Sequence, residues 1–109
     1  MNFGKPYICF HSKPLFMPQF TVRFELDSND PNDYKALDER LILFNFTEIL
    51  MTDDGQAHVL PRGEYRIEGD LTCQRVLDLA LLAADQFKDR CKVLVTESAE
   101  LAWFGLSRA

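Results

Sequence analysis

The chain has 109 residues, the size of one domain, and 47% of them are hydrophobic, a fraction typical of a folded globular protein rather than a disordered one. The net charge is −5 at pH 7, from 17 acidic and 12 basic residues, and every acidic residue lies after position 19. This balance argues against broad phosphate binding, which needs clustered lysine and arginine, but it leaves room for a small basic patch.

The three cysteines, Cys9, Cys73 and Cys91, show no spacing typical of a disulfide framework or a zinc site. We therefore expect them to be small apolar residues in a reducing compartment, which favours a cytoplasmic protein. No apolar run approaches the roughly 20 residues that span a bilayer, so no membrane contact is expected. The sequence also lacks a glycine-rich phosphate loop and a metal-ligand motif, and we expect neither a cofactor nor a metal.

Residues 1–19 are expected to form an extension that precedes a single domain of residues 20–109. Three of the five prolines lie in this extension, and Met17 is an alternative start of the chain. The favoured interpretation is an unstructured or loosely docked segment. The alternative is that Tyr7–Phe10 adds an edge strand to the sheet.

The first two elements of the domain have clear sequence patterns. Phe20–Leu26 has the clearest alternation of apolar and polar residues in the chain, which predicts a half-buried strand with Arg23 on its polar face. A helix is predicted over residues 31–44, because Asp30 is a suitable N-cap and apolar residues recur at helical spacing. Asn45 is a suitable stop, since asparagine tolerates the left-handed conformation.

The stretch Thr47–Gly69 is expected to be the hairpin around which the sheet is organised. Two strand-like runs flank an Asp-Asp-Gly sequence at 53–55, which is typical of a tight turn. Pro61 cannot donate a hydrogen bond and should interrupt the second run. Residues 64–68 then alternate like a half-buried strand, in which Tyr65 points inward.

A second helix is predicted from about Cys73 to Lys88, with Thr72 as its N-cap. A strand at Cys91–Glu97 and a short final strand at Leu101–Leu106 follow. The resulting order is β-α-β-β-α-β with a short extra C-terminal strand. This order predicts the α+β class and a ferredoxin-like arrangement, which has an antiparallel sheet with both helices on one face.

The third strand carries the residues that best suit chemistry. His58 lies near Arg62 and Arg66, and a histidine acts as an acid or base near neutral pH. RNA cleavage without a metal needs such a base and a cation that stabilises the phosphorane. We therefore name His58, Arg62 and Arg66 as catalytic candidates, and Arg23, Arg62 and Arg66 as RNA-binding candidates. The alternative is an exposed strand histidine with no role.

Each of two further groups of residues has both a functional and a purely structural interpretation. Trp103 and Phe104 occupy adjacent strand positions, so one of them must face away from the core. That aromatic side chain suits an interface, or the capping of the core at the sheet edge. Asp53 and Asp54 form a carboxylate pair that suits a divalent metal, but an Asp-Asp-Gly sequence is more often only a turn.

Several short segments spread over residues 18–106 form a recognisable pattern. They are FTVRFEL at 20–26, Asp33-Tyr34, Asp53-Asp54-Gly55, Leu60-Pro61 with Glu64-Tyr65, Val76-Leu77-Asp78, VLVTE at 93–97 and Trp103-x-Gly105-Leu106. In this pattern the chain resembles the small bacterial proteins grouped with GhoS, the antitoxin of a type V toxin–antitoxin system. The resemblance implies a ferredoxin-like fold and a sequence-selective endoribonuclease that acts on the messenger RNA of a small membrane toxin.

The leading hypothesis is a cytoplasmic GhoS-like protein that cleaves or binds single-stranded messenger RNA, and a homodimer is compatible with it. One alternative is a non-catalytic acidic protein that binds and inhibits a protein partner. Another is a small ligand-binding or purely oligomerising domain. Clustering of Arg23, Arg62 and Arg66 on one surface would favour RNA, whereas a continuous acidic patch beside an exposed Trp103 or Phe104 would favour a protein partner.

Overall fold

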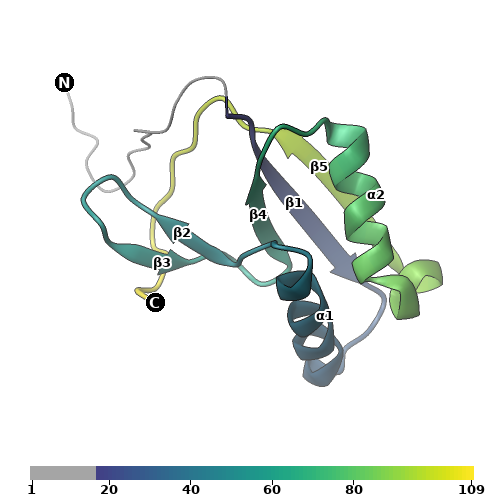
Figure 1. Ribbon diagram of the computed structural model, residues 1–109. Helices are drawn as coiled ribbons and strands as arrows, with labels where there is room; N and C mark the ends of the chain where they lie inside the picture. The colour runs from purple at the N-terminus through teal and green to yellow at the C-terminus, as the bar shows by residue number, and fades with distance from the viewer. Residues whose placement is uncertain (1–16) are drawn as a thin grey trace.

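The computed structural model describes residues 17–109, so the alternatives for Tyr7–Phe10 lie outside the described residues. The fold is mixed α+β, with antiparallel sheets and two main helices (Figure 1). The elements in chain order are β1 (Gln19–Leu26), α1 (Pro31–Leu43), β2 (Ile49–Met51), β3 (Ala57–Val59), β4 (Glu64–Glu68), α2 (Cys73–Ala83), the 3₁₀ helix η1 (Asp85–Arg90) and β5 (Cys91–Glu97).

The main sheet has three strands in the order β4-β1-β5, and both pairings are antiparallel. Thr21, in the middle of β1, lies opposite Arg66 of β4 on one side and Thr96 of β5 on the other. The expected centre, the hairpin in Thr47–Gly69, is therefore wrong. Strands β2 and β3 form a separate two-stranded sheet that projects from the main sheet, and the predicted strand order differs accordingly (Figure 1).

The break around Pro61 and Gly63 explains this difference. The turn at 53–55 and the interruption at Pro61 are confirmed, because β3 ends at Val59 and β4 begins only at Glu64. Gly63 has a φ of +85°, which redirects the chain, and its carbonyl accepts a 2.7 Å hydrogen bond from the Phe24 amide. This bond holds the start of β4 beside β1. Strand β4 therefore belongs to the main sheet, whereas β3, before the interruption, pairs with β2.

Both helices cover one face of the main sheet. The alternate side chains of β1 point to this face and are buried, as are Tyr65 and Ile67 of β4, which confirms the predicted inward set of both strands. Side chains from α1 and α2 join the same cluster. The core members from these elements are Phe20, Val22, Phe24, Leu26, Leu37, Leu41, Tyr65, Ile67, Val76, Ala80 and Ala83.

The helix ends follow the sequence closely. Asp30 caps α1 by accepting a 2.9 Å hydrogen bond from the Asn32 amide, and Asn45 takes a φ of +72° just after the helix. Thr72 caps α2 by accepting from the Arg75 amide at 3.1 Å. The single helix expected up to Lys88 is wrong beyond residue 83, because the chain tightens into η1 and turns Phe87 into the core.

The expected final strand at Leu101–Leu106 does not form. Gly105 has a φ of +79° and interrupts the segment. The last residues instead run along β3, where the Ser107 carbonyl accepts from the Val59 amide and the Ala109 amide donates to the Ala57 carbonyl, both at 2.9 Å. The C-terminal residues thus lie beside the small sheet and not beside β5 (Figure 1).

Candidate functional site

The face of the main sheet opposite the helices is called the helix-free face. Its side chains follow from the strand register, because residues directly opposite each other share a face. Cations and carboxylates alternate across it, with threonine, glutamine and leucine between them. Its residues are Gln19, Thr21, Arg23 and Glu25 of β1, Glu64, Arg66 and Glu68 of β4, and Lys92, Leu94 and Thr96 of β5.

Arg66 is the most firmly held cation on the helix-free face. Its Nη1 donates to Thr21 Oγ1 at 2.8 Å and its Nη2 donates to Gln19 Oε1 at 2.6 Å. The Thr21 hydroxyl is itself 3.1 Å from the Ser98 hydroxyl. Because Arg66 is only 9% exposed, these hydrogen bonds fix its guanidinium in one orientation.

Arg23 shares the helix-free face with Arg66. It lies opposite Glu64 of β4, and this pair is the next one on the same face after the Thr21–Arg66 pair, which makes Arg23 and Arg66 diagonal neighbours. Unlike Arg66, Arg23 is exposed. The structure therefore brings together two of the three arginines that the sequence suggested for RNA binding.

Arg62 does not join them. Its guanidinium carbon lies 4.8 Å from the centre of the Tyr34 ring, a cation–π contact with α1, which packs on the opposite face of the sheet. The Tyr34 hydroxyl accepts a 3.0 Å hydrogen bond from the Leu26 amide, which fixes the ring beneath Arg62. The chain reversal at Gly63 thus separates Arg62 from Arg66, although they are close in sequence.

His58 belongs to the small sheet. It pairs with Leu50 across the hairpin, and its ring centre lies 6.0 Å from that of Trp103. Its Nδ1 atom is buried and has no hydrogen-bond partner in the part of the chain that the structure describes. The structure thus does not bring His58, Arg62 and Arg66 together as a group, because each of them contacts different residues.

The two candidate interface residues differ in exposure. Trp103 is half-buried beside His58, whereas Phe104 is 83% exposed. An exposed phenylalanine beside a packed tryptophan is a possible point of attachment for another molecule, but one residue alone defines no site.

A buried tyrosine and two carboxylates form a cluster that the sequence did not suggest. The Tyr65 hydroxyl donates a hydrogen bond to the Asp38 carboxylate on α1. Burial, and then the Asp38 hydrogen bond, raise the pKa of Tyr65. Burial and the negative charge of Asp38 also raise the pKa of Glu48. The spacing of Tyr34, Asp38 and Leu41, at i, i+4 and i+7, is the signal that places Asp38 beside the inward face of α1.

Glu48→Gln is expected to stabilise the protein at pH 7. The pKa of Glu48 in the folded state lies above its ordinary value of 4.5, so the folded state binds this proton more tightly than the unfolded state does. The charged carboxylate therefore costs stability above the folded pKa, and this cost disappears as the pH falls through that value. Because Glu48 is only partly buried, water screens the charges, and we expect a gain on the order of 0.5 kcal/mol at pH 7 and none near pH 3.5.

Urea denaturation at the two pH values measures this effect. Glu39→Gln is the matched control, because Glu39 is an exposed glutamate on α1. It should leave the free energy of unfolding unchanged at pH 7. A gain for Glu48→Gln that persists at the lower pH would show that charge removal is not its cause.

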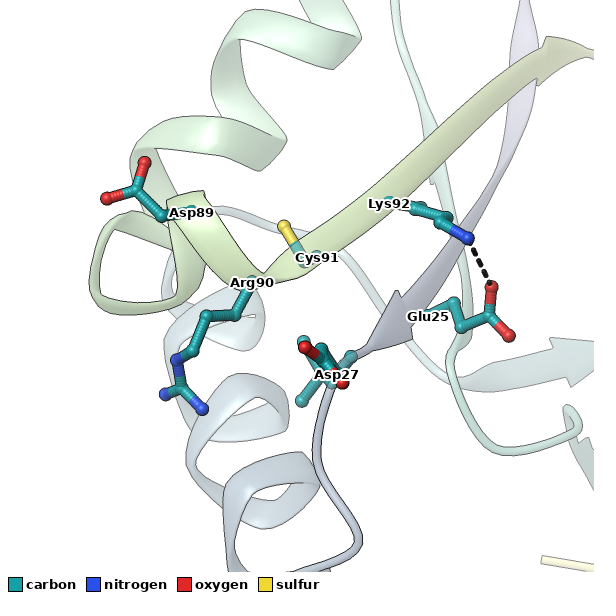
Figure 2. Close-up of a pocket in the computed structure, with 7 residues that line it drawn as sticks. Glu25, Asp27, Asp89, Arg90, Cys91 and Lys92 are labelled. Carbon is teal, nitrogen blue, oxygen red and sulfur yellow. Dashed lines mark ion pairs between the residues drawn. The ribbon is translucent and has the colours of Figure 1, made fainter.

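An open depression of about 490 Å³ lies where β1 ends and β5 begins (Figure 2). The Lys92 ammonium lies 3.9 Å from a Glu25 oxygen across its rim. Burial raises the pKa of the Cys91 thiol, which disfavours the nucleophilic thiolate. Both signs of charge line the depression, so it does not select an anion or a cation. The lining residues are Glu25, Leu26, Asp27, Asp89, Arg90, Cys91 and Lys92.

Asp54, at the hairpin turn, forms hydrogen bonds with neighbouring residues. The Asp54 carboxylate accepts from the Thr52 hydroxyl and, at 3.2 Å, from the Gln56 amide, and these hydrogen bonds lower the pKa of Asp54. Among residues 17–109, no three histidine, cysteine, aspartate or glutamate side chains gather in a way that would hold a metal ion. The Asp54 carboxylate thus stabilises the turn.

Comparison with protein family models, with curated proteins and with solved structures finds no match. Within the described part of the chain, no helix has the length and apolar character needed to cross a membrane. A function must therefore be argued from the residues and their placement.

Proposed function

We propose that this chain is a cytoplasmic RNA-binding protein of the GhoS-like antitoxin type, which acts on single-stranded messenger RNA through the helix-free face. The observation that carries the proposal is the placement of Arg66 and Arg23 as diagonal neighbours on this face. A guanidinium that is already held by Gln19 and Thr21 loses little conformational freedom when it meets a phosphate. Its planar fork also suits two phosphate oxygens.

The glutamates on the helix-free face limit the kind of nucleic acid that fits. Glu64 lies directly opposite Arg23, and Glu68 lies opposite Gln19, so a long phosphate track would meet negative charge. A single strand that makes a few phosphate contacts avoids this cost, and its binding is strongly salt-dependent. The net charge of −5 favours the same limited mode.

The fold proposal that accompanies this function is a ferredoxin-like arrangement with one shortened strand. The order β4-β1-β5 with helices on one face supports it. Thr47 exchanges two backbone hydrogen bonds with Arg66, at 2.9 and 2.7 Å, on the outer side of β4. A fourth strand of the arrangement would occupy this position, and here only a single residue pairs.

RNA binding is proposed ahead of RNA cleavage. His58 packs against Trp103 and Arg62 lies over Tyr34, whereas Arg66 is bound to Gln19 and Thr21. A metal-independent endoribonuclease would need a base and a cation around one phosphate. Incubation of RNA with the protein in EDTA, for the wild type and for His58→Ala, tests this part of the proposal directly.

Arg23→Gln is expected to weaken RNA binding about fivefold, because it removes one exposed phosphate contact and leaves the hydrogen bonds of Arg66 intact. The slope of the logarithm of the association constant against the logarithm of salt concentration should fall by about 0.7. Fluorescence anisotropy with a labelled single-stranded RNA measures both. Arg75→Gln, on an exposed position of α2, is the matched control and should leave affinity and slope unchanged. Wild-type protein with no salt-sensitive RNA binding would overturn the proposal.

The second candidate function is the binding of a protein partner without catalysis. Phe104, 83% exposed in a chain of net charge −5, is the observation that favours it. An exposed aromatic anchor on a chain with a net negative charge fits a basic protein surface. The same titration separates the two candidates, because a domain that only binds a protein partner should show no salt-sensitive RNA binding in the wild type.

A further inference from the structure

The outer edge of β5 has no backbone partner among residues 17–109. The Ser98 amide donates to the Gln19 carbonyl at 2.7 Å, and the Asp27 amide donates to the Arg90 carbonyl at 2.8 Å. These two bonds show which residues of β1 and β5 form the hydrogen-bonded pairs of the ladder. The even-numbered residues of β5 therefore bond to β1. The amides and carbonyls of Val93 and Val95 point the other way, and no backbone group of residues 17–109 pairs with them.

The opposite edge of the sheet, at β4, is partly paired. Arg66 of β4 directs its amide and carbonyl outward, and both bond to Thr47. The Glu64 amide donates to the Pro61 carbonyl at 2.9 Å. Within residues 17–109, the outward groups of Arg66 and the Glu64 amide of β4 are therefore paired, whereas those of Val93 and Val95 of β5 are not.

Strand β5 lacks most features that prevent edge pairing. It is seven residues long and contains no proline or glycine, and its pairing with β1 runs without a bulge from Cys91 to Glu97. Its one lysine, Lys92, lies near one end and is engaged with Glu25. Leu94, at the middle of the strand, is 65% exposed on the helix-free face.

We propose that the open edge of β5 binds β5 of a second copy of this chain, in antiparallel orientation, with the two-fold axis at Leu94. In this register Val93 of one copy lies opposite Val95 of the other, and such a pair exchanges two hydrogen bonds. This register brings the outward-pointing amides and carbonyls of Val93 and Val95 in one copy against those of Val95 and Val93 in the other. The interface is isologous, as a two-fold dimer requires, and the two sheets join into one of six strands.

The side chains are also complementary in this register. The two Leu94 side chains meet at the axis as a non-hydrogen-bonded pair, where side chains approach most closely. Lys92 lies opposite Thr96, so no like charges oppose each other across the interface. Val93 and Val95, which are partly buried against the core, gain cover on the helix side. A different extended peptide would find the same backbone groups but not this matched set of side chains, and the dimer does not depend on RNA binding.

Leu94→Lys tests the proposal with the full chain. Wild type should show a mass that rises with concentration from 12.6 kDa toward twice that value, by analytical ultracentrifugation across the micromolar range. The variant places two like charges at the axis, and we expect the dimer dissociation constant to rise about tenfold or more. Leu43→Lys, at a leucine of similar exposure on α1, is the matched control and should dimerise as wild type does. Circular dichroism verifies that both variants fold.

Leu94→Cys tests the register. The introduced thiols face each other across the axis at a distance that a disulfide can close, so mild oxidation should yield a covalent dimer. Thr96→Cys moves the thiol away from the axis and should yield no more covalent dimer than wild type, which carries its own cysteines. A wild type that stays monomeric, or a dimer that Leu94→Lys leaves unchanged, would overturn the proposal, and the second result would direct attention to another surface.

Discussion

Gly63→Ala should lower the free energy of unfolding by about 3 kcal/mol, a large part of the total stability of a domain of this size. Gly63 has a φ of +85°, which strains any other residue. A Cβ atom at this position would also lie 2.5 Å from the Phe24 carbonyl oxygen. That oxygen belongs to the backbone of the central strand, so it cannot move away without disturbing the β1–β4 pairing. Chemical denaturation measures the loss.

Gly55→Ala is the matched control for this prediction. Gly55 has nearly the same φ, +86°, but nothing lies within 4 Å of the Cβ position. Alanine there should cost only the backbone strain, about 1 kcal/mol. Equal losses at the two positions would mean that the close approach of Gly63 to β1 does not contribute to stability.

Phe20→Ala is expected to cost about 3–5 kcal/mol, because it removes a fully buried aromatic side chain and leaves a cavity. Phe20 is the second residue of β1 and packs into the cluster that both helices share. The midpoint of thermal unfolding, followed by circular dichroism, should fall by well over 10 °C, provided that the variant still folds.

The same substitution at Phe104 provides the comparison. Because Phe104 is 83% exposed, Phe104→Ala should change the free energy of unfolding by less than about 0.5 kcal/mol. A large loss at Phe104 would contradict the exposed position of its ring, and a small loss at Phe20 would contradict the placement of the core on the helix side of the sheet.

The parts of the fold that depend on local chemistry were predictable. The alternation of Phe20–Leu26, the Asp30 and Thr72 caps and the turn at 53–55 each involve residues close in sequence. Strand partners were not predictable in this way, because alternation identifies a strand but not its neighbours. The sheet order depends on Gly63, whose carbonyl meets an amide 39 positions earlier, at Phe24.

The same distinction explains what was predicted of the candidate site. The shared face of Arg23 and Arg66 follows from the period of two in each strand once their pairing is known. The positions of Arg62 and His58 depend on distant neighbours, Tyr34 and Trp103, which no short pattern indicates. The Asp38–Tyr65 hydrogen bond likewise joins a helix and a strand 27 residues apart.

The attachment of the C-terminal residues to β3 divides the protein into two parts with different expected rates of amide hydrogen exchange. The Val59 and Ala109 amides are bonded only while residues 107–109 stay beside β3. These two amides therefore become exposed together when residues 107–109 leave β3, and this opening does not require β1 to separate from β4 or β5. Exchange at the Val59 and Ala109 amides reports on the release of the C-terminal residues, whereas exchange at β1 reports on unfolding of the whole domain.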